Sequence, residues 1–115
     1  MSEPTIYRKE LLKAVLENHA VTSVDVREIR FQPDQRTGRH LHPCPVFGYI
    51  AEGSAILEVE GEPPQHLPAG SAFHEPAGKV IARFDNASAT APLTFIAYYL
   101  LHGQQELIAM LPDAS

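Results

Sequence analysis

The stretch GRHLHPCPVFGYIAEG, residues 38–53, contains the only pair of histidines in the chain that are two residues apart. Pro43 and Pro45 interrupt any strand that follows the pair, whereas residues 46–51 are apolar enough for a buried strand. In an extended chain the side chains at positions i and i+2 lie on the same face. His40 and His42 can therefore bind one metal ion from one side, and neutral imidazole suits Zn, Fe, Cu and Ni.

Turn residues divide the rest of the chain into short segments. All seven glycines and nearly all of the ten prolines follow residue 32. This spacing predicts many short strands and a β-sandwich or barrel. The expected strands cover residues 21–31, 46–51, 55–60, 65–67, 71–75, 80–84 and 93–101.

Two segments near the N-terminus depart from a simple alternation of apolar and polar residues. Val24 and Val26 alternate in the opposite phase to Ile29 and Phe31, which predicts a β-bulge near Arg27–Glu28. Before the first strand, residues 7–18 carry Leu and Val at helical spacing among Lys, Glu and Ala. A helix is the expectation there, with a strand as the alternative.

A second group of turn residues extends the first motif. Gly70, Pro76-Ala77-Gly78 and Asp85-Asn86, together with residues 38–53, resemble the two motifs of the cupin family. The resemblance implies an all-β fold, a double-stranded β-helix or jelly-roll barrel. It also implies a single domain over residues 1–115, with an N-terminal extension (1–22), a barrel core (31–101) and a tail (103–115).

The family resemblance also implies a metal site, which this chain matches in part. His40 and His42 occupy the first two ligand positions, but Val46 and Ile81 occupy the carboxylate and third-histidine positions. His74 or Glu75 could substitute, and because they are neighbours on one strand only one of them can face the interior. The resemblance therefore implies one divalent metal, Zn, Fe, Ni or Mn. A site that is empty or only partly occupied is an equally plausible expectation.

Three functions remain compatible with the sequence, and catalysis stays an open question. The first is a cupin that binds a small molecule in the barrel, with an incomplete metal site. The alternatives are a metal-dependent enzyme, dioxygenase- or isomerase-like, that uses substitute ligands, and a non-catalytic interaction or regulatory barrel. The candidate ligand-binding residues are His40, His42, Arg83, which would share the face of Ile81, and Tyr49.

Composition limits the partners. The formal net charge is −5 and the basic residues are scattered, so neither nucleic acid nor an anionic membrane is an expected partner. The single cysteine excludes an internal disulfide, and no leader-like segment opens the sequence, so a cytoplasmic location is expected. Residues 95–101 are apolar on both faces, which together with the resemblance to small cupins predicts a homodimer.

Overall fold

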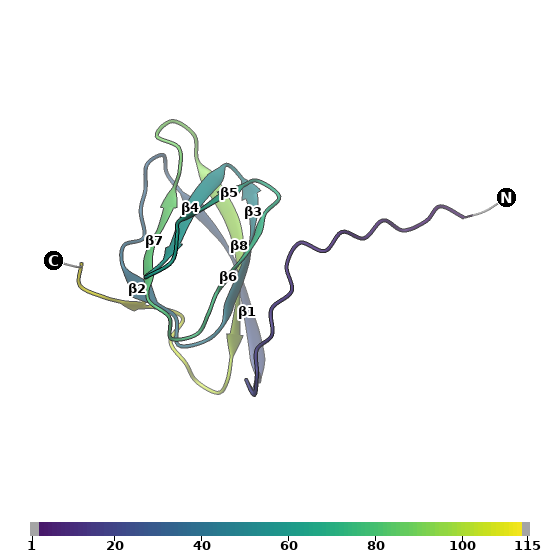
Figure 1. The fold of residues 1–115 in the computed structure, drawn as a ribbon, viewed down its shortest axis with the longest axis horizontal. Coiled ribbons are helices and arrows are strands. Elements are labelled where there is room, and N and C mark those ends of the chain that lie inside the picture. Colours follow the sequence, from purple (N-terminus) through teal and green to yellow (C-terminus); the bar gives the residue numbers. More distant parts are fainter. Residues whose placement is uncertain (1–2, 114–115) are drawn as a thin grey trace.

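The computed structural model describes residues 3–113, and within that range all regular structure is β-strand (Figure 1). The strands are β1 Ser23–Phe31, β2 His40–Leu41, β3 Val46–Glu52, β4 Ser54–Val59, β5 Gln65–Pro68, β6 Ala72–Glu75, β7 Ile81–Asn86, β8 Leu93–Leu101 and β9 Ala109–Met110. They form two antiparallel sheets, with strand orders β1-β8-β3-β6 and β5-β4-β7-β2-β9. The predicted all-β fold is confirmed.

The core lies between the two sheets. Strand β4 shows why these residues form strands, because Ala55, Leu57 and Val59 are buried while the residues between them are partly exposed. On the other sheet, β8 buries Leu93 and Phe95 in the same alternating way. The side chains of the two inner faces therefore pack against each other, as the alternation predicts.

The N-terminal arm, residues 3–22, has no regular secondary structure, so the helix expected over residues 7–18 is wrong. The chain bends at Glu17 and Asn18, which have positive φ values of 25° and 53°, and the arm extends away from the barrel (Figure 1). A short helix is marginal in water unless its apolar face packs on a core. Here only the base of the arm, residues 15–19, adjoins the barrel, and Tyr7 further out is 84% exposed.

Strand β1 also differs from its prediction. It pairs with β8 in one uninterrupted register from Ser23 to Phe31, so the bulge expected near Arg27–Glu28 is absent. Val24 and Val26 face outward and are 53% and 56% exposed. The change of phase in the sequence therefore marks a strand that has apolar residues on both faces.

A bulge does occur in β7, where the sequence does not suggest one. Glu58 pairs with Arg83, but the next residue on β4, Val59, pairs with Ile81. The extra residue places Ile81 in the core and turns Arg83 outward. The expectation that Arg83 shares the face of Ile81 is therefore wrong, because an extra residue reverses the alternation.

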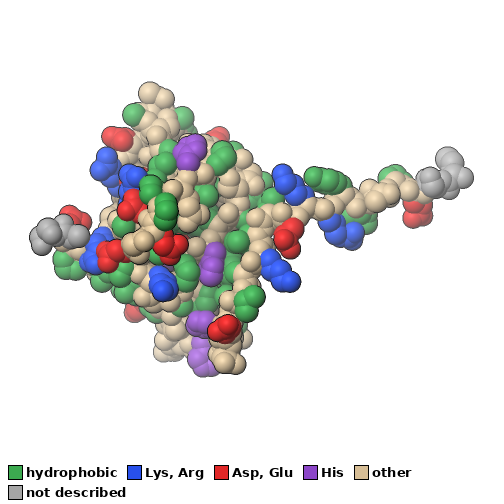
Figure 2. All heavy atoms as spheres, viewed as in Figure 1, with side chains coloured by type: hydrophobic (Ala, Val, Ile, Leu, Met, Phe, Trp, Pro, Cys, Tyr) green, Lys and Arg blue, Asp and Glu red, His purple; other side chains and the backbone are tan. Residues whose placement is uncertain are grey.

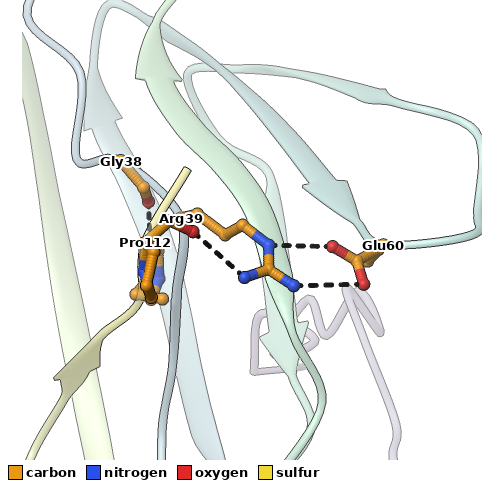
Figure 3. Close-up of polar contacts among 5 residues, drawn as sticks. Gly38, Arg39, Glu60 and Pro112 are labelled. Carbon is orange, nitrogen blue, oxygen red and sulfur yellow. Dashed lines mark hydrogen bonds and ion pairs between the residues drawn. The ribbon is translucent and has the colours of Figure 1, made fainter. Parts of the chain in front are cut away.

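The C-terminal segment, expected to be a tail, contains β9, which covers β2. His40 pairs with Met110 and Leu41 with Ala109. Arg39 fixes this arrangement: its guanidinium binds Glu60, with Nε 3.0 Å from Oε2, and donates from Nη1 to the carbonyl of Pro112 at 3.1 Å (Figure 3). The last described residues are thus attached to the strand that carries His40.

Candidate metal and ligand site

Three buried side chains form the candidate site. His40 is on β2, His42 follows that strand, and Glu75 ends β6 on the opposite sheet. Their exposed fractions are only 2%, 4% and 3%. One ligand atom from each residue lies within 4.8 Å of the other two, which makes this a His-His-Glu cluster able to hold a metal ion.

Backbone carbonyls orient both imidazole rings. His40 Nδ1 lies 2.7 Å from the carbonyl oxygen of Gly38, and His42 Nδ1 lies 2.7 Å from that of Leu107. Because a carbonyl only accepts, each Nδ1 carries a proton and donates it. In the neutral ring Nε2 then keeps its lone pair, which is how metal-binding histidines are commonly oriented.

Both Nε2 atoms point towards the same carboxylate. His40 Nε2 is 3.7 Å from Glu75 Oε2, and His42 Nε2 is in direct contact with that oxygen. The two imidazole centroids are 5.0 Å apart and nearly perpendicular. The three donors therefore converge on one point from two strands of different sheets.

Glu75 lies directly opposite Val46 in the pairing of β6 with β3. Directly paired residues project from the same face of a sheet, so the two side chains reach the same region of the interior. Val46 is the position at which the resemblance noted in the sequence places the family's carboxylate ligand. In this chain the carboxylate stands on the neighbouring strand, across the ladder from that position.

Glu75 and His40 each stabilise the charged form of the other. Burial alone would raise the pKa of Glu75, but the hydrogen bonds and charges of His40 and His42 lower it overall. Burial alone would lower the pKa of His40, and Glu75 with the Gly38 carbonyl raises it. The site thus favours an ionised carboxylate, which in a buried position requires a cation beside it.

An apolar cavity of about 160 Å³ adjoins the three donors. Phe31, Phe73, Phe84 and Phe95 line it and contact each other, with ring centroids 4.8–6.2 Å apart. Gly48 leaves room for the Phe73 ring in the cavity wall, because a Cβ at position 48 would lie 2.0 Å from that ring. Replacing Gly48 would therefore displace Phe73.

The remaining candidate residues lie outside this cavity. His74 faces the outside of β6, where its ring stacks on Phe47 with centroids 4.5 Å apart. Tyr49 is 38% exposed and Arg83 pairs with Glu58 at 3.3 Å, and neither lines the cavity. The choice between His74 and Glu75, open in the sequence, falls on Glu75 as the inward residue.

Two contributions to the site are not evident from the sequence. The carbonyl of Leu107 orients His42 from 65 residues away, within the segment expected to be a tail. The four phenylalanines come from β1, β6, β7 and β8, and only the register brings them together. The sequence offers Glu75 as one of two substitute ligands, but that it stands directly opposite Val46 depends on the pairing of β3 with β6.

The sequence-family model for the cupin domain matches residues 27–99, which is more than half of the chain. The chain therefore belongs to the cupin family. A comparison with curated proteins gave no match.

Solved structures share the fold. The DMSP lyase DddQ from Ruegeria pomeroyi is 18% identical, with a TM-score of 0.66 over 76% of this chain and 43% of the lyase. A cupin-like protein from Thermotoga maritima is 24% identical, with a TM-score of 0.62 over 73% of this chain and 63% of that protein. An uncharacterised double-stranded β-helix protein from Klebsiella pneumoniae is 21% identical, with a TM-score of 0.61 over 76% and 77%.

These similarities establish the fold and no more. The chain spans less than half the length of the lyase and less than two thirds of the Thermotoga protein. Structures with this fold include a lyase, an oxalate oxidase and a polyketide cyclase, so the fold does not select one chemistry. Within residues 3–113 there is no helix long and apolar enough to cross a membrane.

Proposed function

We propose that this cupin binds one divalent transition metal through His40, His42 and Glu75, and that a small molecule binds beside the metal in the apolar cavity. The observation that carries the proposal is the convergence of two Nε2 atoms on a buried carboxylate at the wall of that cavity. The metal would act as a Lewis acid or as the binding point for an oxygen ligand.

The donor set supports this proposal. Two imidazoles and one carboxylate suit Zn, Fe, Ni or Mn, and three protein ligands leave further positions for a ligand. The Gly38 and Leu107 carbonyls orient the rings before any metal binds. A bound metal ion would replace the proton of an imidazolium as the positive charge that compensates this buried carboxylate.

A carboxylate exchange between two strands tests the metal site. We expect Glu75→Val to weaken Zn²⁺ binding by more than about 100-fold, because loss of a mere outer-shell partner already costs 10–100-fold. The double variant Val46→Glu, Glu75→Val should recover much of that affinity, because the two positions face each other across the ladder. Zn²⁺ affinity is measured by competition with a chromophoric chelator, after metal removal.

Glu62→Val serves as the matched control, since Glu62 is exposed in the turn after β4 and should leave Zn²⁺ affinity unchanged. The circular dichroism of each variant establishes that the barrel is folded. Equal Zn²⁺ affinity in wild type and a folded Glu75→Val variant would overturn the proposed site. Failure of the double variant alone would show that position 46 does not reach the two histidines.

Catalysis is a second candidate function, supported by the open coordination positions of a two-histidine, one-carboxylate site. A dioxygenase-like or isomerase-like reaction in this cavity requires the metal, so its activity would disappear in Glu75→Val. A regulatory barrel without a ligand requires neither metal nor cavity. Oxygen-consumption assays with Fe²⁺-loaded protein separate the catalytic case from simple binding.

We also infer that the chain forms a homodimer through the outer face of the sheet β1-β8-β3-β6. Paired positions on this face form a continuous row: Val26 beside Tyr98, Tyr98 beside Phe47, and Phe47 beside His74. Val26 and Tyr98 are 56% and 38% exposed. An apolar face of this kind is typical of a surface that meets a partner.

The N-terminal arm supports a second copy as that partner. Ile6, Tyr7 and Val15 are 68%, 84% and 78% exposed, and Figure 2 shows hydrophobic side chains along the arm away from the barrel. The same chain therefore carries an exposed apolar face and an exposed apolar segment. In a two-fold dimer each arm could cover the face of the other copy, with both contacts repeated by symmetry.

A cytoplasmic location remains part of the proposal and rests on cysteine usage. Cys44 is the single cysteine of the chain and is fully buried, so the fold depends on no disulfide. Reducing compartments are where such proteins are usual.

A further inference from the structure

We infer that the ligand of this cavity is an apolar molecule about the size of one six-membered ring, with a single polar end that points towards His40, His42 and Glu75. This inference rests on the proposed ligand site and specifies its ligand. It follows from the apolar side chains that line the cavity, from the small number of polar groups that face inward, and from the volume of the cavity.

The walls are almost entirely hydrocarbon. Besides the four phenylalanine rings, Ile29, Val46 and Ala97 line the cavity. Phe84 and Phe95 approach each other to 4.8 Å between centroids at an interplanar angle of 52°, so the rings present both faces and edges. A ring-shaped apolar ligand could therefore stack on one phenylalanine and meet the edge of another.

Few polar groups remain for a ligand. No lysine or arginine lines the cavity, so a second anionic group would find no positive partner there. The Thr37 hydroxyl lines it but already donates to the carbonyl of Phe84 at 2.9 Å. Apart from Thr37 and Tyr99, the polar groups are His40, His42 and Glu75, all within one cluster. Hydroxyls elsewhere on a ligand would lose hydrogen bonds to water, at roughly 1–3 kcal/mol each.

The volume limits the ligand to one ring. An engineered protein cavity of about 150 Å³ lined by Leu, Ile and Phe binds benzene. The cavity here measures about 160 Å³. Ile29, Phe31 and Thr37 are its half-buried lining residues, whereas the other lining residues are buried. The cavity therefore opens between β1 and the segment before β2, beside Ile29, Phe31 and Thr37.

Three probes of graded shape and polarity test the inference. Phenol has one ring and one polar end, benzene-1,3,5-triol places hydroxyls around the same ring, and 1-naphthol adds a second ring. Binding is measured by chemical-shift titration of full-length protein, both metal-free and Zn²⁺-loaded. We expect phenol to bind at least tenfold more tightly than either of the other probes in both forms, because the walls do not depend on the metal.

Ala97→Leu should weaken phenol binding at least tenfold, because Ala97 lines the cavity and a larger side chain would fill it. Ala51→Leu is the matched control, since Ala51 is exposed on β3 and should leave phenol binding unchanged. Zn²⁺ affinity, measured in parallel, is expected to stay the same in both variants.

The outcomes separate the ligand class from the metal site. Equal or tighter binding of the triol or of naphthol would overturn the ligand class, and so would phenol binding that Ala97→Leu leaves unchanged. Zn²⁺ binding without phenol binding would also overturn the ligand class while leaving the metal proposal intact. Phenol binding that follows the expected order without any Zn²⁺ affinity would support the ligand class and refute the metal site.

Discussion

At the scale of single residues, the carboxylate of Asp85 is buried without full hydrogen bonding, which is unfavourable. It is only 6% exposed, its Oδ1 lacks a hydrogen-bond partner among the described residues, and Oδ2 is 3.7 Å from the guanidinium of Arg83. Burial raises the pKa of this carboxyl, although Arg36 and Arg83 act in the opposite direction.

We therefore expect Asp85→Asn to increase the free energy of unfolding at pH 7 by about 1 kcal/mol, since a buried charge that has one unsatisfied oxygen and only a long contact with Arg83 is removed. A raised pKa in the folded state means that the wild type pays for ionisation above that pKa. Below the ordinary value of 3.8 the carboxyl is protonated in both states, so the difference between variant and wild type should vanish there.

Thermal unfolding at pH 7 and at pH 3.5 measures this difference, with about 4 °C expected at the higher pH. Asp113→Asn is the control, because Asp113 is exposed and should change neither midpoint. A variant less stable than the wild type at pH 7 would show that the two arginines outweigh burial at Asp85.

Single-residue chemistry was predictable only where neighbours in the sequence decide it. His40 and His42 stand two residues apart, so their common direction follows from an extended chain. Glu75 was a candidate from the sequence together with His74, but the choice between them required the orientation of β6 in the folded barrel. The orientation of Arg83 required the bulge in β7, and a bulge depends on the partner strand rather than on the residues that form it.

At the scale of elements, the short strand β9 holds the histidine strand in place. Its neighbour Leu111 donates to the carbonyl of Arg39 at 2.9 Å, and the Arg39 side chain in turn binds Glu60 and Pro112. Only two residues of β9 pair with β2. The Arg39 side chain therefore adds a hydrogen bond from Nη1 to this segment at Pro112, while Glu60 holds the guanidinium in place.

We expect Arg39→Ala to increase amide hydrogen exchange over residues 107–112 by roughly fivefold, equivalent to about 1 kcal/mol of lost local stability. Arg30→Ala is the control, because Arg30 forms an exposed ion pair with Glu28 on the opposite sheet. Hydrogen exchange followed by mass spectrometry gives both rates. Unchanged exchange over residues 107–112 would mean that backbone pairing alone holds β9.

Elements were predictable where burial alternates and turns punctuate the chain. Strands β3 to β8 follow the predicted segments closely, because one face of each packs on the core. The N-terminal arm was mispredicted because helical spacing alone does not provide a surface to pack on. Strand β9 was missed because two residues are too few for a recognisable pattern.

At the scale of the whole molecule, the N-terminal arm lengthens an otherwise closed barrel. The overall dimensions are 65 × 40 × 24 Å, and Figure 1 shows that the arm accounts for the long direction. A segment with several exposed apolar side chains is costly in water. The proposed dimer would remove that cost.

We expect the full-length chain to sediment as a dimer and a variant lacking residues 1–16 to dissociate at least tenfold more readily. The loss of even one or two buried side chains of 1.5–3 kcal/mol each would produce that change. Sedimentation velocity at several concentrations measures the dissociation constant. The point variant Tyr7→Ser, Val15→Ser should shift it in the same direction, because both residues are exposed on the arm.

Substituting Lys9 and Lys13 by alanine is the control, since these charges lie on the arm without contributing to its apolar surface. A full-length protein that is monomeric at high concentration would refute the dimer. A dimer whose dissociation constant is unaffected by the arm deletion would place the interface on the sheet face alone.

The direct opposition of Val46 and Glu75 has a consequence for how such sites evolve. Apart from Ile81 at the third-histidine position, two substitutions separate the placement of this carboxylate from the family pattern, and their order matters. A lineage that gained the second carboxylate before losing the first would have kept its ion throughout. Homologues that descend from that intermediate should carry acids at both positions. Annotation that compares one alignment column at a time would score this chain as having lost a ligand, whereas comparison of facing positions along the ladder would score the ligand as conserved.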